Sequence, residues 1–116
     1  MVVRTVLSET EIDRVFHALA DATRRDIVRR TLLGEASVSE LADAYAMSFA
    51  AVQKHVGVLE GAGLVSKRPR GRTRIVRAEP SQIDRVRGLL DAYADLWRGR
   101  IDRLDALLDD TRDTRS

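Results

Sequence analysis

Residues 37–65 have the sequence SVSELADAYAMSFAAVQKHVGVLEGAGLV, and the fold follows from this stretch. It begins with Ser37 and has Glu40 three positions later. A serine and a glutamate at this spacing form a capping box, in which each side chain bonds the backbone amide of the other residue at the start of a helix. The pair therefore predicts a short helix over 38–45.

A second, longer helix follows after a tight turn at Ala46 and Met47. Ser48 is placed to cap this helix, and Gly63 supplies the left-handed conformation that commonly ends one. We predict the helix over 49–62. Its inward apolar positions are Val52, Val56 and Leu59.

Two further helices are predicted before this stretch. Ser8 and Glu11 have the spacing of another capping box, for a helix over 9–20, and Asp21 can cap a helix over 22–33. Apolar residues recur at helical spacing in both helices. They are Ile12, Val15, Phe16 and Leu19 in the first, and Ile27, Val28, Leu32 and Leu33 in the second.

The chain changes character after these helices. The segments 64–69 and 72–77 contain residues that favour strands, and residues 69–71 indicate a turn between them. This pattern predicts a two-stranded β-hairpin. Between positions 67 and 77 the hairpin has no acidic residue, and its basic residues are Lys67, Arg68, Arg70, Arg72, Arg74 and Arg77.

A long helix is predicted to close the chain, opened by Pro80 and Ser81. Its apolar positions are Ile83, Val86, Leu90, Tyr93, Trp97, Ile101, Leu104 and Leu108. At a rise of about 1.5 Å per residue this stripe is roughly 40 Å long, more than the core of so small a domain covers. A second copy of the chain is the simplest partner for it. We expect a single domain over 1–116, with a core over 9–78 and a dimerisation helix over 79–110.

Composition excludes several classes of protein. The chain has 116 residues and no cysteine, which rules out disulfides and thiolate metal sites. Hydrophobic residues make up 44% and charged residues 33%, a balance typical of a folded domain. No apolar run reaches the ~20 residues that cross a bilayer. We therefore expect a cytoplasmic protein without a membrane segment.

The net charge of +2 hides an uneven distribution. Residues 21–78 have a net charge of +5, whereas residues 1–20 and 79–116 have net charges of −1 and −2. A concentrated basic segment is typical of proteins that bind a polyanion. Two helices with a tight turn, followed by a basic hairpin, predict a winged helix-turn-helix. The expected fold is therefore mainly α with a small β-hairpin, and the expected partner is double-stranded DNA.

The predicted DNA contacts follow from that fold. The second helix of a helix-turn-helix enters the major groove, and its first turns reach the base edges. The residues at these positions are Ser48, Phe49, Ala50, Gln53 and Lys54. Backbone or minor-groove contacts are predicted for Arg68, Arg70, Arg72 and Arg74 in the hairpin and for Arg24 in the second helix. Arg24 has a local alternative, since this helix also offers Asp21 and Asp26 for pairing.

Four segments together resemble the ArsR-type winged-helix repressors. They are ALADATRRDI at 18–27, SVSELA at 37–42, SFAAVQKHV at 48–56 and LEGAGLV at 59–65. The resemblance is close over residues 10–78 and loose over the last helix. It implies a homodimer that binds a pseudo-palindromic operator and usually represses transcription.

The resemblance also implies that the first and last helices pair across the dimer. The predicted interface residues are Ile12, Val15, Leu90, Tyr93, Trp97, Ile101 and Leu104. Tyr93 and Trp97 have an alternative role, which is to line an effector pocket between protomers. The sequence identifies no effector.

The chain departs from the family's metal-sensing patterns. One family motif reads Glu-Leu-Cys-Val-Cys-Asp-Leu, and here Ser37 and Ser39 occupy the two cysteine positions. Serine hydroxyls are poor ligands for thiophilic metals. Another family site uses histidines and carboxylates of the last helix, which here has four aspartates between 91 and 105 and no histidine. Residues 97–105 resemble the metal-independent branch, so we expect a regulator without a metal or another cofactor.

Other functions remain open alternatives. The long amphipathic helix is also compatible with a protein-interaction module, and the basic hairpin with a non-specific architectural DNA-binding protein. A metal site among the aspartates of 91–105 is a third alternative. The serines, histidines and aspartates occur without a nucleophile motif, a glycine-rich phosphate loop or a metal-ligand spacing, so we expect no enzyme.

Overall fold

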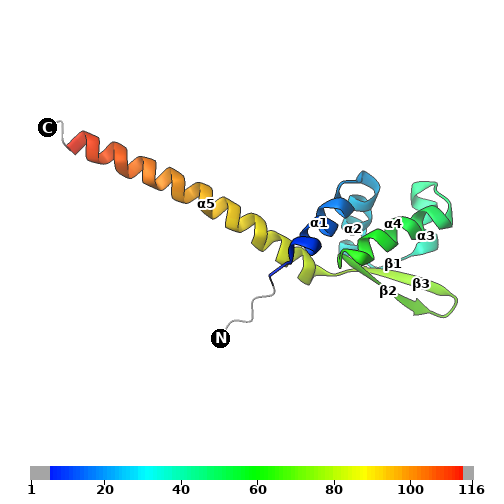
Figure 1. Cartoon of the computed structure of the whole chain (residues 1–116). Coiled ribbons are helices and arrows are strands. Elements are labelled where there is room, and N and C mark those ends of the chain that lie inside the picture. The colour runs from blue at the N-terminus through cyan, green and yellow to red at the C-terminus, as the bar shows by residue number, and fades with distance from the viewer. Residues whose placement is uncertain (1–5, 114–116) are drawn as a thin grey trace. The chain divides into compact units, whose positions relative to one another are not determined.

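The structure of the chain is a computed structural model that describes residues 6–113, with side chains through residue 111. Helices dominate it, and its strands form one small sheet (Figure 1). In chain order the elements are α1 (Glu9–Leu19), α2 (Ala22–Leu33), β1 (Ala36–Ser37), α3 (Val38–Tyr45), α4 (Phe49–Gly61), β2 (Val65–Arg70), β3 (Thr73–Ala78) and α5 (Pro80–Asp113). The predicted winged helix-turn-helix is confirmed.

The first four helices begin at the residues that the sequence predicts as caps. Ser8 and Ser37 each accept a bond from the amide of the glutamate three residues later, and that glutamate accepts from the serine amide in return. Both capping boxes are therefore confirmed. Asp21 and Ser48 cap α2 and α4 by accepting from an amide of the first turn. Local sequence thus determines where these helices start.

The end of α4 depends on Gly63, which has a φ of +74°. The Gly63 amide donates to the Glu60 carbonyl, and the Leu64 amide donates to the Leu59 carbonyl. This pair of bonds is a Schellman motif. A Cβ at position 63 would lie 3.2 Å from Nε2 of Gln82. The position therefore favours glycine for its backbone conformation and for its close neighbour.

The sheet has one strand more than the hairpin predicted from the sequence. Its strand order is β1-β3-β2, and β1 pairs antiparallel with β3, with Ala36 opposite Val76. The predicted hairpin is confirmed as β2 and β3. The sequence did not predict β1, because two residues are too few to show a strand's alternation. The turn also lies later than predicted, at Gly71 and Arg72, and Pro69 pairs with Arg74 inside the hairpin. Pro69 is tolerated because β2 is an edge strand.

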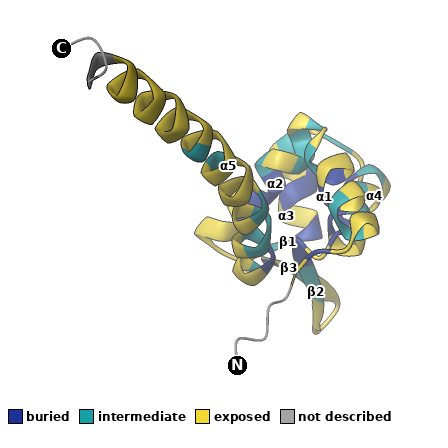
Figure 2. Ribbon diagram, turned by 60° about the vertical axis from the view of Figure 1, so that its left-hand side comes forward, coloured by how far each residue is buried: buried dark blue, intermediate teal, exposed yellow. Residues whose placement is uncertain are grey.

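The core lies where the first four helices pack on one another and on the sheet (Figure 2). Its largest fully buried side chains are Val15, Ile27, Val38, Leu41, Val52, Val56, Leu59, Leu64 and Val76. The inward positions predicted for α4 are therefore confirmed. Leu32 and Leu33 were predicted on the apolar side of α2, and this is wrong, because they are 48% and 81% exposed. Thr31 is buried instead, and its hydroxyl donates to the Ile27 carbonyl at 2.7 Å.

Contacts within the chain cluster into two units that meet between Arg85 and Val86. The first residues of α5 belong to the first unit. There Gln82 is buried and donates to the Ala62 carbonyl at 3.0 Å, and Arg85 pairs with Glu11 at 3.3 Å. These bonds attach the start of α5 to α1 and α4.

The described part of the second unit consists of α5 from Val86 to Asp113. Most of its side chains are exposed (Figure 2). The large exposed apolar residues are Leu90, Tyr93, Leu96, Trp97, Ile101, Leu104, Leu107 and Leu108. Among the residues that the structure describes, no helix is long and apolar enough to span a membrane.

Candidate nucleic-acid interface

A single left-handed residue joins the two helices of the helix-turn-helix. Ala46 has a φ of +53°, and its amide donates to the carbonyls of Ala42 and Asp43. The Met47 amide donates to the Ala42 carbonyl at 3.1 Å. These bonds close α3, and α4 begins at Phe49 after its cap. The predicted tight turn is confirmed, and α4 follows α3 as a recognition helix follows the first helix of this motif.

The residues predicted to contact bases lie at the start of α4. Ser48, Phe49, Ala50 and Lys54 are exposed, and Gln53 is half-buried. The Ser48 hydroxyl accepts from the Ala51 amide at 3.1 Å, so its oxygen serves the cap. On the other side of the helix, three fully buried residues hold α4 on the core. They are Val52, Val56 and Leu59.

We call residues 65–78, which form β2, β3 and their turn, the wing. Side chains alternate between the faces of a strand pair, and residues opposite each other share a face. Val76 is fully buried, and Arg74 lies on its face. Arg68 and Arg70 lie on the outward face, and Arg72 lies in the turn. The wing therefore presents exposed arginines on both faces and at its tip.

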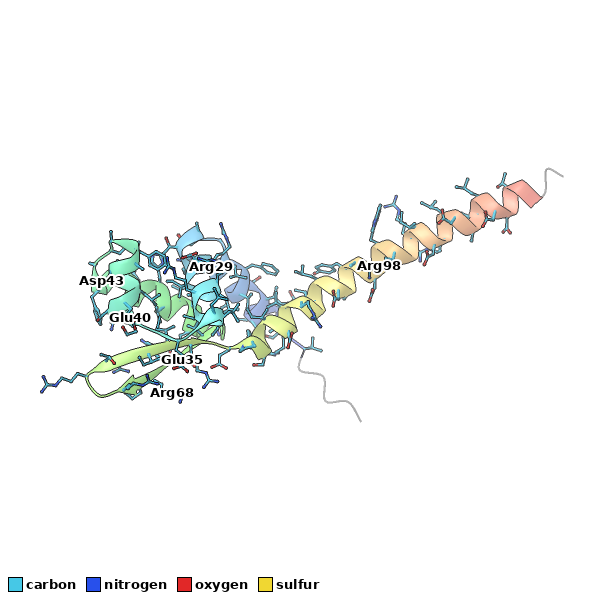
Figure 3. All side chains as sticks on the ribbon, turned by 180° about the vertical axis from the view of Figure 1, so that it is seen from behind. Arg29, Glu35, Glu40, Asp43, Arg68 and Arg98 are labelled. Atoms are coloured by element: carbon cyan, nitrogen blue, oxygen red, sulfur yellow. The ribbon has the colours of Figure 1, made fainter. Side chains whose placement is uncertain are left out.

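Two basic residues of the wing form ion pairs. Lys67 is half-buried and pairs with Glu60 of α4 at 3.7 Å, and Arg70 pairs with Glu35 at 3.5 Å. Within residues 6–111, the side chains of Arg68, Arg72 and Arg74 form no ion pair. Figure 3 labels Arg68 on the hairpin and Glu35 near it. Three of the four predicted wing arginines thus have no carboxylate partner among the described residues that a polyanion would have to displace.

Arg77 is a wing residue that the predicted contacts omit. It is exposed, and it lies opposite Ser66 on the same outward face as Arg68 and Arg70. The signal was present in the sequence, because Thr73, Ile75 and Arg77 follow the two-residue period of a strand. The sequence did not show the strand register, which places Arg77 on the same face of the hairpin as the arginines of β2.

Arg24, predicted to contact the DNA backbone, is instead engaged within the fold. Its Nε donates to the Ala18 carbonyl at 2.8 Å, and Nη2 donates to the His17 carbonyl at 3.1 Å. Its Nη1 lies 3.2 Å from Nδ1 of His55 on α4. The backbone amide of Arg24 donates to Asp21. Each nitrogen of the guanidinium thus has a partner within the fold, and a contact of Arg24 with the DNA backbone stays a prediction.

A cluster around Asp26 ties α2 to α3. The Tyr45 hydroxyl donates to Asp26 at 2.6 Å, and Arg29 and Arg30 both bond the same carboxylate. The Tyr45 bond, with the two guanidinium groups, holds the pKa of Asp26 far below its usual range. Partial burial and the Asp26 carboxylate raise the pKa of Tyr45 to about 12. Arg30 also lies over the Tyr45 ring at 5.1 Å, which braces the first helix of the motif against α2.

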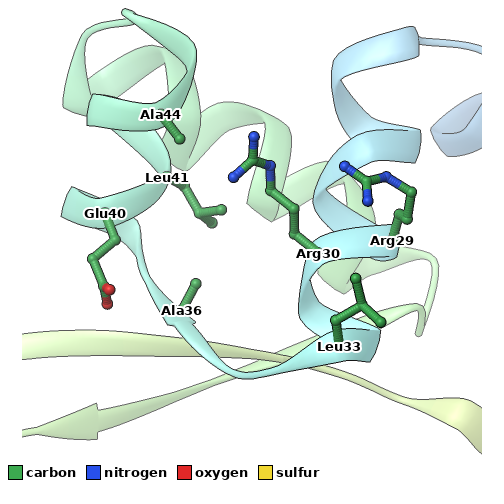
Figure 4. Close-up of a pocket in the computed structure, with 7 residues that line it drawn as sticks. All are labelled: Arg29, Arg30, Leu33, Ala36, Glu40, Leu41 and Ala44. Carbon is green, nitrogen blue, oxygen red and sulfur yellow. The ribbon is translucent and has the colours of Figure 1, made fainter.

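A pocket of about 490 Å³ opens between α2 and α3 beside this cluster (Figure 4). Its lining residues are Arg29, Arg30, Leu33, Ala36, Glu40, Leu41 and Ala44. The two guanidinium groups lie on the α2 side, and the Glu40 carboxylate lies on the α3 side. These charged groups already have partners in the fold, because Asp26 binds both guanidinium groups and the Glu40 carboxylate accepts from the Ser37 amide. The sequence did not predict this pocket, because its walls come from three separate elements.

The residues predicted for a dimer interface differ in their exposure. Leu90, Tyr93, Trp97, Ile101 and Leu104 are all exposed on α5. Ile12 of α1 is half-buried. Val15 is fully buried within the single chain, so its side chain has no surface left for a second copy. Its assignment to the interface is wrong, because α1 directs Val15 into the core of the same chain.

Side chains that could bind a metal are scattered over the molecule. Among the described residues, no three histidine, aspartate or glutamate side chains gather closely enough to bind one ion. Ser37, at one of the family's cysteine positions, is buried, and its hydroxyl accepts from the Glu40 amide.

Comparisons with known proteins agree with this geometry. Residues 19–68, which include α2, α3 and α4, match the family of helix-turn-helix domains. The HTH-type transcriptional regulator Rv2034 of Mycobacterium tuberculosis is 42% identical over 81 residues, which are 70% of this chain and 76% of the relative.

Two solved structures extend the similarity to the whole fold. A crystal structure of an ArsR family transcriptional regulator is 32% identical, with a TM-score of 0.74 over 81% of this chain and 97% of the other. A solution structure from Mycobacterium bovis is 26% identical, with a TM-score of 0.61 over 79% of this chain and 91% of the other. That protein is described as a homodimeric winged helix-turn-helix DNA-binding domain of a possible ArsR-family regulator.

Proposed function

Because this chain belongs to the ArsR family of winged helix-turn-helix transcriptional regulators, we propose that it is a homodimeric repressor of a pseudo-palindromic operator. In this proposal α4 reads the bases, the wing binds the DNA backbone, and no metal is sensed. The proposed location of the protein is the cytoplasm, which contains the DNA that it is proposed to bind. The observation that carries the proposal is the exposed start of α4 beside a wing with exposed arginines on both faces.

Base reading is proposed for the exposed side of the first turns of α4. Gln53 can bond adenine with both ends of its amide, and Lys54 can reach guanine. Phe49, 48% exposed, and Ala50 can contact a thymine methyl group. Ser48 acts mainly as the cap, and its hydroxyl hydrogen remains available to a phosphate.

The wing is proposed to bind phosphates and the minor groove. Arg72 lies in the turn, and Arg68 and Arg74 lie on opposite faces of the hairpin. This arrangement suits a hairpin that has phosphate strands on both sides, as in a minor groove. Arg70 joins them once DNA competes with Glu35 for its guanidinium, since an exposed pair is worth little.

A second copy of the chain is proposed to cover the apolar side of α5. Eight large apolar side chains are exposed between Leu90 and Leu108, and an exposed apolar stretch of this kind is typical of an interaction surface. The proposed interface keeps Ile12, Leu90, Tyr93, Trp97, Ile101 and Leu104, and it omits Val15. A symmetric dimer would place two copies of α4 about 34 Å apart on one side of the DNA.

Metal independence is proposed from the chemistry of the side chains present. The positions of the family's cysteines carry serines, and the Ser37 hydroxyl is used as a helix cap. Serine is a poor ligand for soft metals. The aspartates of α5 between 91 and 105 are spread along the helix, and Asp91 and Asp95 each pair with an arginine.

The test is binding of the purified protein to its own upstream DNA and to random DNA, at ~150 mM salt, with and without zinc. We expect tight and selective binding to the upstream DNA that zinc does not change. Equal binding to both DNAs would favour an architectural protein, and no binding to either would favour a protein-interaction module. A change in affinity on adding zinc would revive a metal site.

Two variants separate the proposed roles. Gln53→Ala should lower affinity for the operator more than for random DNA, because it removes a base contact. Arg72→Ala should weaken both alike and flatten the salt dependence by about 0.9 in log–log slope, because it removes one phosphate contact. Equal effects of Gln53→Ala on every DNA sequence would contradict base reading by this residue.

A further inference from the structure

Arg24 joins three helices through one side chain. Its guanidinium binds the carbonyls of His17 and Ala18 in the last turn of α1, at 3.1 and 2.8 Å. The third nitrogen lies 3.2 Å from Nδ1 of His55, which is in the middle of α4. Arg25 bonds the next carbonyl of α1, that of Leu19, at 2.7 Å, but it makes no bond to α4.

The contact between Arg24 and His55 has a definite chemistry. A guanidinium is always protonated and can only donate, so Nδ1 of His55 must accept. The carboxylate of Asp21, 4.0 Å from the same Nδ1, also accepts from the Arg24 amide and so holds the arginine backbone in place. The bonds of Arg24 therefore connect the position of His55 to that of α1.

Because His55 lies on α4, its contact with Arg24 affects the orientation of the proposed reading helix. His55 follows Gln53 and Lys54, which are proposed to read bases, and it is half-buried on a neighbouring side of the helix. The buried valines and Leu59 press α4 onto the core, but apolar contacts have no direction. A hydrogen bond from a rigid guanidinium does have one, and it resists rotation and sliding of α4 against α1.

We infer that Arg24 and His55 are positioning residues for DNA recognition, which orient α4 relative to α1 without touching DNA. The inference rests on the proposed function, since α4 is the proposed reading helix and α1 carries part of the proposed dimer interface. In a dimer, the orientation of α4 against α1 sets how the two reading helices meet successive major grooves.

The salt dependence of binding separates positioning from a phosphate contact. The experiment measures operator affinity over a range of salt concentrations for the wild type, Arg24→Gln and Arg24→Lys. A positioning role predicts a loss of about tenfold in both variants with the wild-type slope, because the single nitrogen of lysine cannot reach acceptors that three separate guanidinium nitrogens serve. Arg72→Gln is the matched control, and its slope should be shallower by about 0.9. A shallower slope for Arg24→Gln, with wild-type binding by Arg24→Lys, would overturn the inference.

Variants of His55 test the other end of the bond. His55→Asn keeps an acceptor near the place of Nδ1 and should retain most of the affinity. His55→Leu keeps the bulk without the acceptor and should lose about as much affinity as Arg24→Gln. The double variant Arg24→Gln/His55→Leu should lose no more than Arg24→Gln alone, because the contact between the two side chains is already absent in that single variant. Additive losses would contradict a shared role.

Two further measurements show whether the variants are folded and which nitrogen of the His55 ring is protonated. The unfolding midpoint of each variant shows that binding is measured on folded protein. The ¹⁵N shifts of the His55 ring in the wild type report the tautomer directly, and we expect an unprotonated Nδ1 near neutral pH. A protonated Nδ1 would overturn the inference whatever the variants do. If the wild type fails to select its operator, the proposed function fails; if it selects and the variants bind as it does, only this inference fails.

Discussion

The two units of this chain use apolar residues in opposite ways. In the winged-helix unit, nine large side chains are less than 2% exposed. In α5 beyond Val86, eight large apolar side chains remain between 37% and 72% exposed. The first unit can bury its apolar residues within one chain because its helices and sheet supply each other's surfaces. The described residues of the second unit form one helix, and we propose that a second copy of the chain covers its apolar stripe.

The polar contacts of the two units differ in the same way. The Asp26 cluster and the Arg24 contacts join separate helices of the first unit. The pairs of the second unit, Arg87–Asp91 and Asp95–Arg98, lie within one helix turn. Pairs of this second kind stabilise a helix but leave its packing undetermined. Stability should therefore depend on different residues in the two units, and each prediction below tests that difference.

The largest effect is expected from Leu104→Glu. A charge in the apolar stripe of α5 would be buried in both copies of the proposed dimer, so self-association should weaken at least about 100-fold. Analytical ultracentrifugation measures the association. Asp102→Ala, on a different side of the same helix, is the control and should leave association unchanged. A dimer that persists when both copies carry the Leu104→Glu substitution would contradict the proposed interface.

Truncating a leucine to alanine should lower the free energy of unfolding by several kcal/mol more in the first unit than in the second. Leu59→Ala leaves a cavity in the core of the first unit and should lower the free energy of unfolding by about 2–5 kcal/mol. Leu107→Ala, made in the monomeric Leu104→Glu background, should change it by less than about 0.5 kcal/mol, because Leu107 is 62% exposed. Denaturant unfolding measures both, and equal losses would contradict the contrast in packing.

Replacing a glycine by alanine should lower stability in the first unit and raise it in the second. Gly63→Ala forces a Cβ into the left-handed region and toward Gln82, so it should cost about 1–3 kcal/mol. Gly88→Ala lies within α5 with open space around its Cβ and should stabilise that helix by up to about 1 kcal/mol. Thermal unfolding and helix content by circular dichroism measure the two changes. A neutral Gly63→Ala would show that the end of α4 has another stable form.

The smallest effect is expected from Asp26→Asn, and it should depend on pH. The pKa of Asp26 is lowered in the folded protein, chiefly by the Tyr45 hydroxyl, below its ordinary value of 3.8. The ionised carboxylate therefore contributes stability above that pH, and this contribution is lost as the pH falls through the acid range. The variant should be less stable than the wild type near pH 7, and the gap should narrow below about pH 4. A gap that stays constant with pH would contradict this origin.

Local patterns in the chain were sufficient for most of the elements. Ser8, Asp21, Ser37 and Ser48 start their helices because a cap needs only its own side chain and the next few amides. Gly63 ends α4 for an equally local reason. The order of these elements, with the basic hairpin, was enough to predict a winged helix-turn-helix. The residues proposed to bind DNA follow from that order and stay a prediction until binding is measured.

Contacts between distant residues could not be predicted from the sequence. The two residues of β1 become a strand only because Val76 lies beside them. Val15 and Leu33 have the same apolar character, yet one is fully buried and the other 81% exposed, according to which helix covers each. The sequence does not show that Arg24 contacts His55, because the two residues are thirty-one positions apart and meet only in the folded chain. Capping and periodicity act over a few bonds and can be read along the chain, whereas burial and the choice of a partner depend on surfaces that meet only after the chain has folded.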